Sequence, residues 1–199
     1  LRHNIIIVSD EIHCDLVYSA YKHLPLSALG ADIAQNTVTL ISPSKTFNIA
    51  GTYTSFAVIP NQALRAKISR LMDALSIGSG NLFGLVAAEA ANRTGGEWLD
   101  ELLSYLEKNA GYLVDFIRQE IPAINTYLPQ GTYLAWLDFA NTAIPASELN
   151  AFLVNQAGLG LNDGITFGPQ GAGFARFNFA CSRALLAEGL TRLKAAVRK

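Results

Sequence analysis

Short apolar runs rich in β-branched residues alternate along the chain with longer stretches in which apolar residues recur at helical spacing. The runs at residues 4–9, 37–41 and 53–59 predict strands. The first is apolar without alternation, which is typical of a strand buried on both faces. Apolar residues three and four positions apart predict helices over residues 61–74 and 81–92. The first half of the chain therefore has the pattern of an α/β domain.

A long amphipathic helix is predicted to begin near Glu97, after the pair Gly95-Gly96. It should end just before Pro122, because proline disfavours a helical conformation in the residue that precedes it. Beyond it, "GTYLAWLDF" and "FARFNFA" predict two strands and are followed by helices with possible serine caps. The expected elements are strands at 131–139 and 174–180, a helix over 147–157 capped by Ser147, and a helix over 182–199 capped by Ser182.

The order of these elements predicts an α/β protein in three parts. We expect an α/β domain over residues 1–95, the long helix over 96–121 as a spine, and a small α+β domain over 122–199. An apolar strand almost at the first residue, Leu1, is unusual because a central strand needs neighbours. We therefore expect the chain to be the C-terminal portion of a longer protein.

Composition and charge narrow the class of protein. Hydrophobic residues make up 50% and charged residues 16% of the chain, which suits a packed globular protein. A net charge of −1 gives no reason to expect nucleic acid or an anionic membrane as a partner. No apolar run approaches the ~20 residues of a membrane helix. Two cysteines, Cys14 and Cys181, form no disulfide framework and predict a reducing, cytoplasmic environment.

The stretch "LISPSKTFNIAG" places Lys45 at the end of an apolar strand, among small hydroxyl residues. Either the charge of Lys45 stabilises the fold or its amine takes part in a reaction. One chemical reading is S-x-x-K, with Ser42 as nucleophile and Lys45 as base, as in penicillin-binding proteins. The S-D-N and K-T-G elements that accompany that motif are absent, and the serine follows a strand instead of opening a buried helix.

A second chemical reading makes Lys45 an imine-forming amine, which requires a partly desolvated pocket. Small hydroxyl neighbours could hold a phosphate beside it, and the carboxylate of Asp10 could pair with a protonated ring nitrogen. Pyridoxal phosphate combines an aldehyde, a phosphate and a pyridine nitrogen.

The stretch "SDEIHCD" gathers Asp10, Glu11, His13 and Asp15 just past the first strand, where open α/β sheets place ligands. Carboxylates with a histidine could bind a metal. Loop solvation and helix capping are the more ordinary roles for such residues, and a catalytic or cofactor contact is the remaining one.

Arg176 lies in the middle of the strand "FARFNFA", among phenylalanines. An arginine there is costly to bury unless it pairs with a carboxylate. That carboxylate could belong to the protein, as a structural ion pair, or to a bound substrate, whose recognition suits the planar guanidinium fork. Arg183, at the start of the last helix, has the pattern of a surface residue.

Together, "SDEIHCDL", "SPSKTFNIAG", "GTYLAWLDF" and "FARFNFACSR" resemble the fold-type I pyridoxal phosphate enzymes of the class I/II aminotransferase family, in particular the cystathionine β-lyase-like C–S lyase branch. The resemblance covers nearly the whole chain. It implies the C-terminal part of the aspartate aminotransferase-like fold: part of the large-domain mixed sheet, a spine helix and a small domain.

The resemblance implies roles for four residues. Lys45 matches the Schiff-base lysine, and Asp10 matches the aspartate that pairs with the pyridinium nitrogen. Ser42 matches a phosphate-binding serine, and Arg176 matches the arginine that clamps the substrate α-carboxylate. Asn178, in the same strand, is assigned no role, and no metal is expected.

Departures from the family pattern also carry information. His13 stands where many aminotransferases have a tyrosine, as in the C–S lyase branch, and is expected at the cofactor. Tyr53 stands where many have a phosphate-binding arginine. The segment "SIGSGNLFG" resembles the part that reaches a neighbouring subunit, with Asn81 as a possible contact. A homodimer is therefore implied for the full-length protein.

The implied reaction is α,β-elimination of a sulfur-containing amino acid to a thiol, pyruvate and ammonia. Transamination between an amino acid and a 2-oxo acid is the alternative within the family, and it uses the same residues. Without the family's N-terminal half, this chain by itself is expected to be a folded but catalytically inactive domain.

Overall fold

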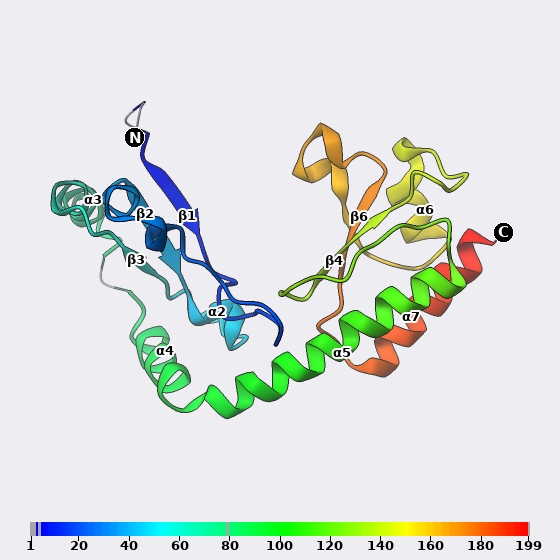
Figure 1. The fold of residues 1–199 in the computed structure, drawn as a ribbon, viewed down its shortest axis with the longest axis horizontal. Coiled ribbons are helices and arrows are strands. Elements are labelled where there is room, and N and C mark those ends of the chain that lie inside the picture. The colour runs from blue at the N-terminus through cyan, green and yellow to red at the C-terminus, as the bar shows by residue number, and fades with distance from the viewer. Residues whose placement is uncertain (1–2, 4, 79, 199) are drawn as a thin grey trace. The chain divides into compact units, whose positions relative to one another are not determined.

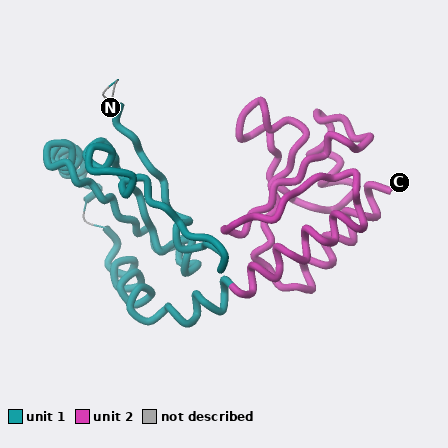
Figure 2. Tube along the Cα trace, in the orientation of Figure 1, with its two compact units in different colours: residues 1–103 teal, residues 104–199 magenta. Residues whose placement is uncertain are grey.

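The computed structural model describes residue 3, residues 5–78 and residues 80–198. They form two compact units, Leu1–Leu103 and Ser104–Lys199 (Figure 2). The boundary falls inside the longest helix, α5 (Gly96–Glu120), which has the length expected of the spine helix. The three-part division at residues 95 and 121 stays a prediction.

Unit 1 is built on a three-stranded sheet, β1 (Ile7–Asp10), β2 (Thr37–Ile41) and β3 (Phe56–Val58), in the order β1-β2-β3 (Figure 1). β1 and β2 run parallel, whereas β3 is antiparallel to β2. Asp10, the last residue of β1, is aligned with Leu40 near the end of β2. The segments that follow β1 and β2 therefore start from the same edge of this sheet.

The prediction that the first strand is buried on both faces is wrong for the described chain. Ile5 and Val8 are each 62% exposed. β1 pairs with β2 only, among the residues that the structure describes, and so lies at the edge of the sheet. The side chains of a strand project from the two faces of the sheet, so they stay accessible wherever no other element packs on that face. Asn4, the predicted start of the strand, lies outside the described residues.

The helices predicted in unit 1 are confirmed, with asparagine caps. α3 (Gln62–Ala74) begins after Asn61, whose side chain accepts a hydrogen bond from Leu64 N, and α4 (Leu82–Thr94) begins after Asn81.

The third strand is shorter than predicted because Tyr53 adopts a left-handed conformation, with φ of 50°. The shorter elements are the 3₁₀ turns η1 (Leu26–Leu29) and η2 (Ala50–Thr52) and the helices α1 (Ala31–Gln35) and α2 (Pro43–Thr46).

α4 lies directly against the turn η2 at Gly84. A Cβ added at Gly84 would stand 2.1 Å from Thr54 Oγ1 and 2.4 Å from Thr52 O, both far below contact distance. Only glycine allows this approach. The contact supports the segment that follows the Lys45 helix α2.

Unit 2 has an antiparallel sheet in the order β4-β6-β5, formed by β4 (Leu134–Asp138), β6 (Phe174–Asn178) and β5 (Asn162–Asp163). α5 and α7 (Arg183–Val197) cover one face of it (Figure 1). The core comprises Leu106, Leu113 and Ile117 of α5, Ala135 and Leu137 of β4, Ala175 and Phe177 of β6, and Leu186, Leu190 and Leu193 of α7. Alternation along β6 turns Arg176 to the opposite face.

The last helix begins as predicted, whereas the one before it does not. Ser182 caps α7, with its Oγ accepting a hydrogen bond from Leu185 N, and the predicted end at Lys199 lies outside the described residues. The predicted Ser147 cap is wrong. Pro145 starts a 3₁₀ turn, η3 (Ala146–Glu148), so the residue before α6 (Leu149–Asn155) is Glu148 and no side chain caps that helix. The turns η4 (Gly164–Phe167) and η5 (Pro169–Gly171) were not expected.

Among the described residues, no helix combines the length and apolar character needed to span a membrane.

Candidate functional site

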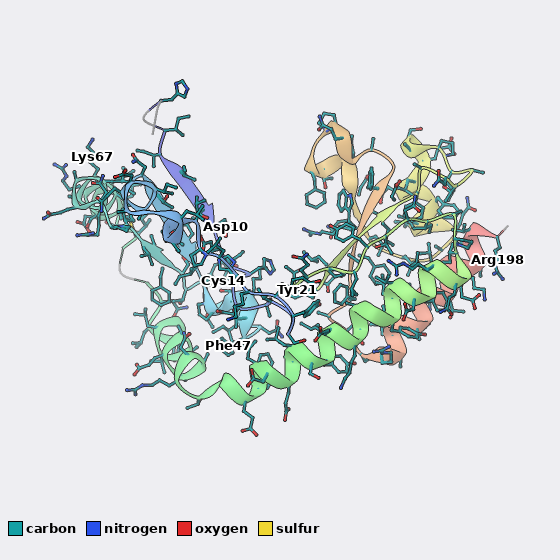
Figure 3. All side chains as sticks on the ribbon, viewed as in Figure 1. Asp10, Cys14, Tyr21, Phe47, Lys67 and Arg198 are labelled. Carbon is teal, nitrogen blue, oxygen red and sulfur yellow. The ribbon has the colours of Figure 1, made fainter. Side chains whose placement is uncertain are left out.

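The candidate catalytic and cofactor-binding residues of the first half of the chain lie at one edge of the unit 1 sheet, where β1 and β2 end. Asp10, which is labelled in Figure 3, ends β1. Its exposed side chain accepts a hydrogen bond from Ile12 N at 3.3 Å. β2 ends at Ile41 and is followed at once by α2, whose third residue is Lys45. Lys45 is half-buried. A carboxylate and an amine thus follow two adjacent parallel strands at one edge.

Ser42 holds the start of α2. Its Oγ accepts a hydrogen bond from Ser44 N at 3.1 Å and donates one to the carbonyl oxygen of Thr54 at 2.7 Å. Ser44 Oγ lies 2.7 Å from Ser42 Oγ, so two hydroxyls meet beside the Lys45 segment. A phosphate contact by Ser42 stays a prediction, and Ser44 is an equally placed hydroxyl that sequence reasoning passed over.

The structure supports neither a structural ion pair of Lys45 nor the S-x-x-K hydrolase reading. Within the part of the chain that the structure describes, neither Lys45 nor Asp10 forms an ion pair. No hydrogen bond joins Lys45 Nζ to Ser42 Oγ among those residues either, and the Ser42 hydroxyl is already committed to Thr54. The S-x-x-K hydrolase reading requires the lysine to take that proton.

Glu11 is buried and holds a loop in place. Its Oε2 lies 2.7 Å from Nε2 of His23, and its Oε1 accepts hydrogen bonds from Ser9 Oγ at 2.9 Å and Leu26 N at 3.1 Å. Burial by itself would raise the pKa of this carboxyl, but these hydrogen bonds and the charge of His23 outweigh it, and the pKa is lowered from its ordinary 4.5. Glu11 therefore anchors the loop that follows Asp10.

Replacing Glu11 with glutamine should destabilise the protein by about 2 kcal/mol at neutral pH, because a charged acceptor of three hydrogen bonds is lost. The lowered pKa sets the pH dependence. The stabilisation is fully present above the ordinary pKa and is lost as pH falls through the lower folded value. Urea unfolding of the whole gene product at about pH 7 and about pH 3 should show the difference only at the higher pH.

The exposed Glu101 offers a control for that experiment, since Glu101→Gln changes the same charge without burial. A Glu11→Gln variant that unfolds at the same urea concentration as Glu101→Gln at neutral pH would contradict the anchoring role.

The turn at residues 12–15 carries His13 and Cys14. The backbone carbonyl of His13, which is half-buried, accepts a hydrogen bond from Leu16 N at 3.0 Å. Burial, reinforced by the neighbouring carboxylate of Asp15, raises the pKa of the Cys14 thiol to about 11, so the thiol stays protonated at neutral pH. No group of three metal-ligating side chains occurs among the described residues, so nothing here supports a metal at this turn.

A side-chain hydrogen bond joins this turn to the Lys45 helix. Thr46 is fully buried, and its Oγ1 donates to Asp15 Oδ2 at 2.8 Å. Phe47 directly follows α2, and its ring lies 6.0 Å from that of Trp98. Sequence reasoning treated Thr46 only as part of a motif, and no local signal could have paired it with a residue 31 positions earlier.

Tyr53 occupies the position where the family pattern has an arginine. It is 87% exposed and has a positive φ of 50°, which is uncommon for a bulky residue. Among the described residues, its hydroxyl forms no hydrogen bond.

In unit 2, Arg176 lies on the sheet face that the helices do not cover. Its Nη2 donates to Asn162 Oδ1 at 3.1 Å, and its Cζ stands 4.8 Å from the centroid of the Phe167 ring. Its Nε is buried without a hydrogen-bond partner in the described chain. Burial raises the pKa of Tyr133, an effect that the charge of Arg176 partly offsets. No ion pair of Arg176 occurs among the described residues, so the structural ion-pair reading is not supported.

Aromatic rings lie beside Arg176 on this face of the sheet. Trp136, its cross-strand partner, stacks on Phe174 and contacts the Phe167 ring edge-on, with both pairs of centroids 5.5 Å apart. The turn that carries Phe167 is held by glycine packing, since a Cβ at Gly171 would lie 1.9 Å from Gly164 O. The Arg176 guanidinium thus contacts the Asn162 amide and the Phe167 ring. No carboxylate of the described chain neutralises its charge.

The remaining named residues have structural contacts. Asn178 Oδ1 accepts a hydrogen bond from Ala180 N at 2.9 Å, and Asn81 Oδ1 accepts one from Phe83 N at 3.0 Å. The Arg183 guanidinium stands 4.4 Å from the centroid of the Tyr112 ring. A contact of Asn81 with a neighbouring subunit stays a prediction.

Comparison with known proteins adds to this geometry. The family model described as aminotransferase class I and II matches residues 1–193. The chain belongs to this family. Its relatives include cystathionine beta-lyase PatB of Bacillus subtilis (strain 168), which is 42% identical over 197 residues, or 99% of this chain and 51% of the relative.

Two solved structures extend the likeness to three dimensions. Cystalysin from Treponema denticola, whose structure contains a pyridoxal 5′-phosphate cofactor, has a TM-score of 0.93 and 34% identity, over 97% of this chain and 49% of that one. The pyridoxal phosphate-bound C–S lyase from Staphylococcus hominis has a TM-score of 0.88 and 30% identity, over 100% of this chain and 51% of that one. The predicted fold class is confirmed. The chain spans about half the length of these relatives.

Proposed function

We propose that the protein to which this chain belongs is a pyridoxal phosphate-dependent carbon–sulfur β-lyase. The observation that carries the proposal is that Asp10 ends β1 and Lys45 lies just after β2, so both are at one edge of the parallel pair in unit 1. The names of its relatives, a cystathionine β-lyase and C–S lyases, favour elimination from a sulfur amino acid.

The residues at this edge fit such a cofactor. Lys45 offers a primary amine for the aldehyde, and Asp10 offers an exposed carboxylate that no cation of the described chain neutralises. Ser42 and Ser44 offer hydroxyls for a phosphate at the start of α2. His13 is a further proposed contact with the cofactor. When bound, pyridoxal phosphate supplies an electron sink for the carbanion at the substrate Cα.

In the proposed reaction, residues of the protein bind and orient the substrate and transfer protons. Arg176 binds the substrate α-carboxylate through its guanidinium, which limits the orientations of the Cα–H bond. Lys45 Nζ removes the Cα proton as general base. The Asp10 carboxylate holds a proton at the pyridine nitrogen. Loss of the thiolate from Cβ, followed by addition of water, yields a thiol, pyruvate and ammonia.

A product assay tests the reaction. The whole gene product, loaded with pyridoxal phosphate, should release pyruvate and ammonia in equal amounts from cystathionine without a 2-oxo acid. Transamination, which the family name leaves open, instead requires a 2-oxo acid and yields an exchanged amino acid. Exchange without pyruvate release would contradict the lyase assignment.

We also propose a cytoplasmic homodimer for the whole protein. Leu82, Phe83 and Val86 of α4 are largely exposed, which supports a partner surface at this helix. Cys14 and Cys181 are free thiols, as expected in a reducing compartment. The mass of the whole protein in solution, measured by light scattering, tests the dimer.

A further inference from the structure

α2 is too short to fix its own direction. It has four residues, and a single turn contributes very few hydrogen bonds to offset the entropy of ordering it. Contacts with other segments must therefore decide where Lys45 points. Its start is tied to Thr54 through Ser42, and its last residue, Thr46, is tied to Asp15.

The Thr46 bond is unusual for a helical threonine. Such hydroxyls commonly bond a backbone carbonyl three or four residues earlier. Thr191 of α7 does so, with its Oγ1 donating to Ala187 O at 2.8 Å. Thr37, the first residue of β2, is fully buried, and its Oγ1 likewise donates to a carbonyl four residues earlier, Ile33 O, at 2.8 Å. Thr46 is equally buried, but its hydroxyl donates instead to a carboxylate 31 residues earlier, at the same distance. Burial of the hydroxyl therefore does not account for the choice of partner.

The two ends of this bond belong to the two segments that carry the proposed chemistry. Thr46 directly follows Lys45. Asp15 lies five residues after Asp10, on a turn closed by hydrogen bonds from Cys14 N to Glu11 O and from Leu16 N to His13 O, both 3.0 Å long. Leu16 is buried, which holds this turn to the unit. A shift at either end would change the separation of the amine from the carboxylate.

We propose that Asp15 and Thr46 are a positioning pair, which sets the place of Lys45 relative to Asp10 through the hydrogen bond between them. The inference rests on the proposed function, because it assigns the pair to the site that Lys45 and Asp10 form there. Neither residue is a catalytic residue, since each acts through its neighbour in the chain.

The test uses the whole gene product with pyridoxal phosphate. Thr46→Val keeps the shape and removes the donor, and kcat should fall roughly tenfold to 100-fold, the effect of a small displacement of a catalytic group. KM should change far less. The visible circular dichroism of the bound cofactor, which reports how its ring is held, should also change. Thr46→Ser restores the hydroxyl and should restore both signals.

Thr37→Val is the matched control, because it removes an equally buried hydroxyl with a bond of equal length. It should leave kcat and the dichroism unchanged. Asp15→Ala, at an exposed residue, should reproduce Thr46→Val, and Asp15→Asn should retain activity through its amide oxygen. The double variant Asp15→Ala with Thr46→Val should lose no more than either single variant.

The inference is overturned if Asp15→Ala matches the wild type in kcat and dichroism, a result that stays decisive even where Thr46→Val fails to fold. It is also overturned if the losses of the two single variants multiply. Borohydride trapping of the wild type separates this failure from a failure of the proposed function. Label on Lys45 with no effect of either substitution refutes the positioning pair alone, whereas no label on Lys45 refutes both.

Discussion

Replacing Lys45 with alanine in the whole gene product is expected to lower the release of pyruvate from cystathionine by about 10³-fold or more. The reason is that one amine serves both as the attachment point of the cofactor and as the general base, and a positioned base alone contributes about 10²–10⁴-fold. Borohydride reduction followed by peptide mass spectrometry should find a phosphopyridoxyl group on Lys45 in the wild type only. Added methylamine should restore part of the activity by supplying a free base.

Lys67, an exposed lysine of α3, provides the control. Lys67→Ala should retain full activity and the label on Lys45. A Lys45→Ala variant that retains more than about a tenth of the wild-type rate would contradict the role of Lys45, since a base that matters contributes far more. A label on another lysine would contradict it equally.

Replacing Arg176 with lysine is expected to lower kcat/KM for the amino acid about 100-fold. The planar fork that can bind both carboxylate oxygens becomes a point charge, and the loss of such a charged pairing affects binding by a few kcal/mol. Lysine keeps the positive charge of Arg176 but cannot keep its contacts with Asn162 and Phe167. The loss of these contacts should add to the fall in kcat/KM. Steady-state kinetics over a range of substrate concentrations measures it.

Arg183→Lys is a matched control, since Arg183 also stacks on an aromatic ring, that of Tyr112. It should change kcat/KM by less than about twofold, because lysine keeps the charge over the ring. A substrate analogue without its α-carboxylate should bind wild type and Arg176→Lys with similar affinity. Equal kinetics for Arg176→Lys and Arg183→Lys would show that Arg176 does not bind the carboxylate.

Local rules account for much of the fold. The long helix, the second strand and the serine cap of the last helix follow from apolar spacing, strand-forming residues and capping, which involve residues a few positions apart. The same rules failed at Ser147, where Pro145 starts a 3₁₀ turn before the helix. They also failed for the first strand, since burial depends on what covers a strand, and periodicity reports only the strand itself.

The candidate site divides in the same way. The sequence by itself determined the chemical types: an amine after a strand, a carboxylate after its neighbour and an arginine among phenylalanines. Only the tertiary structure decided their surroundings: Glu11 bonded to His23, Thr46 to Asp15, and Arg176 held by Asn162 and Phe167. These partners lie 12, 31 and, for Asn162, 14 residues apart, so no local pattern records them. They meet only when the loops between them fold onto the sheets, because hydrogen bonds and ring contacts depend on distance in space.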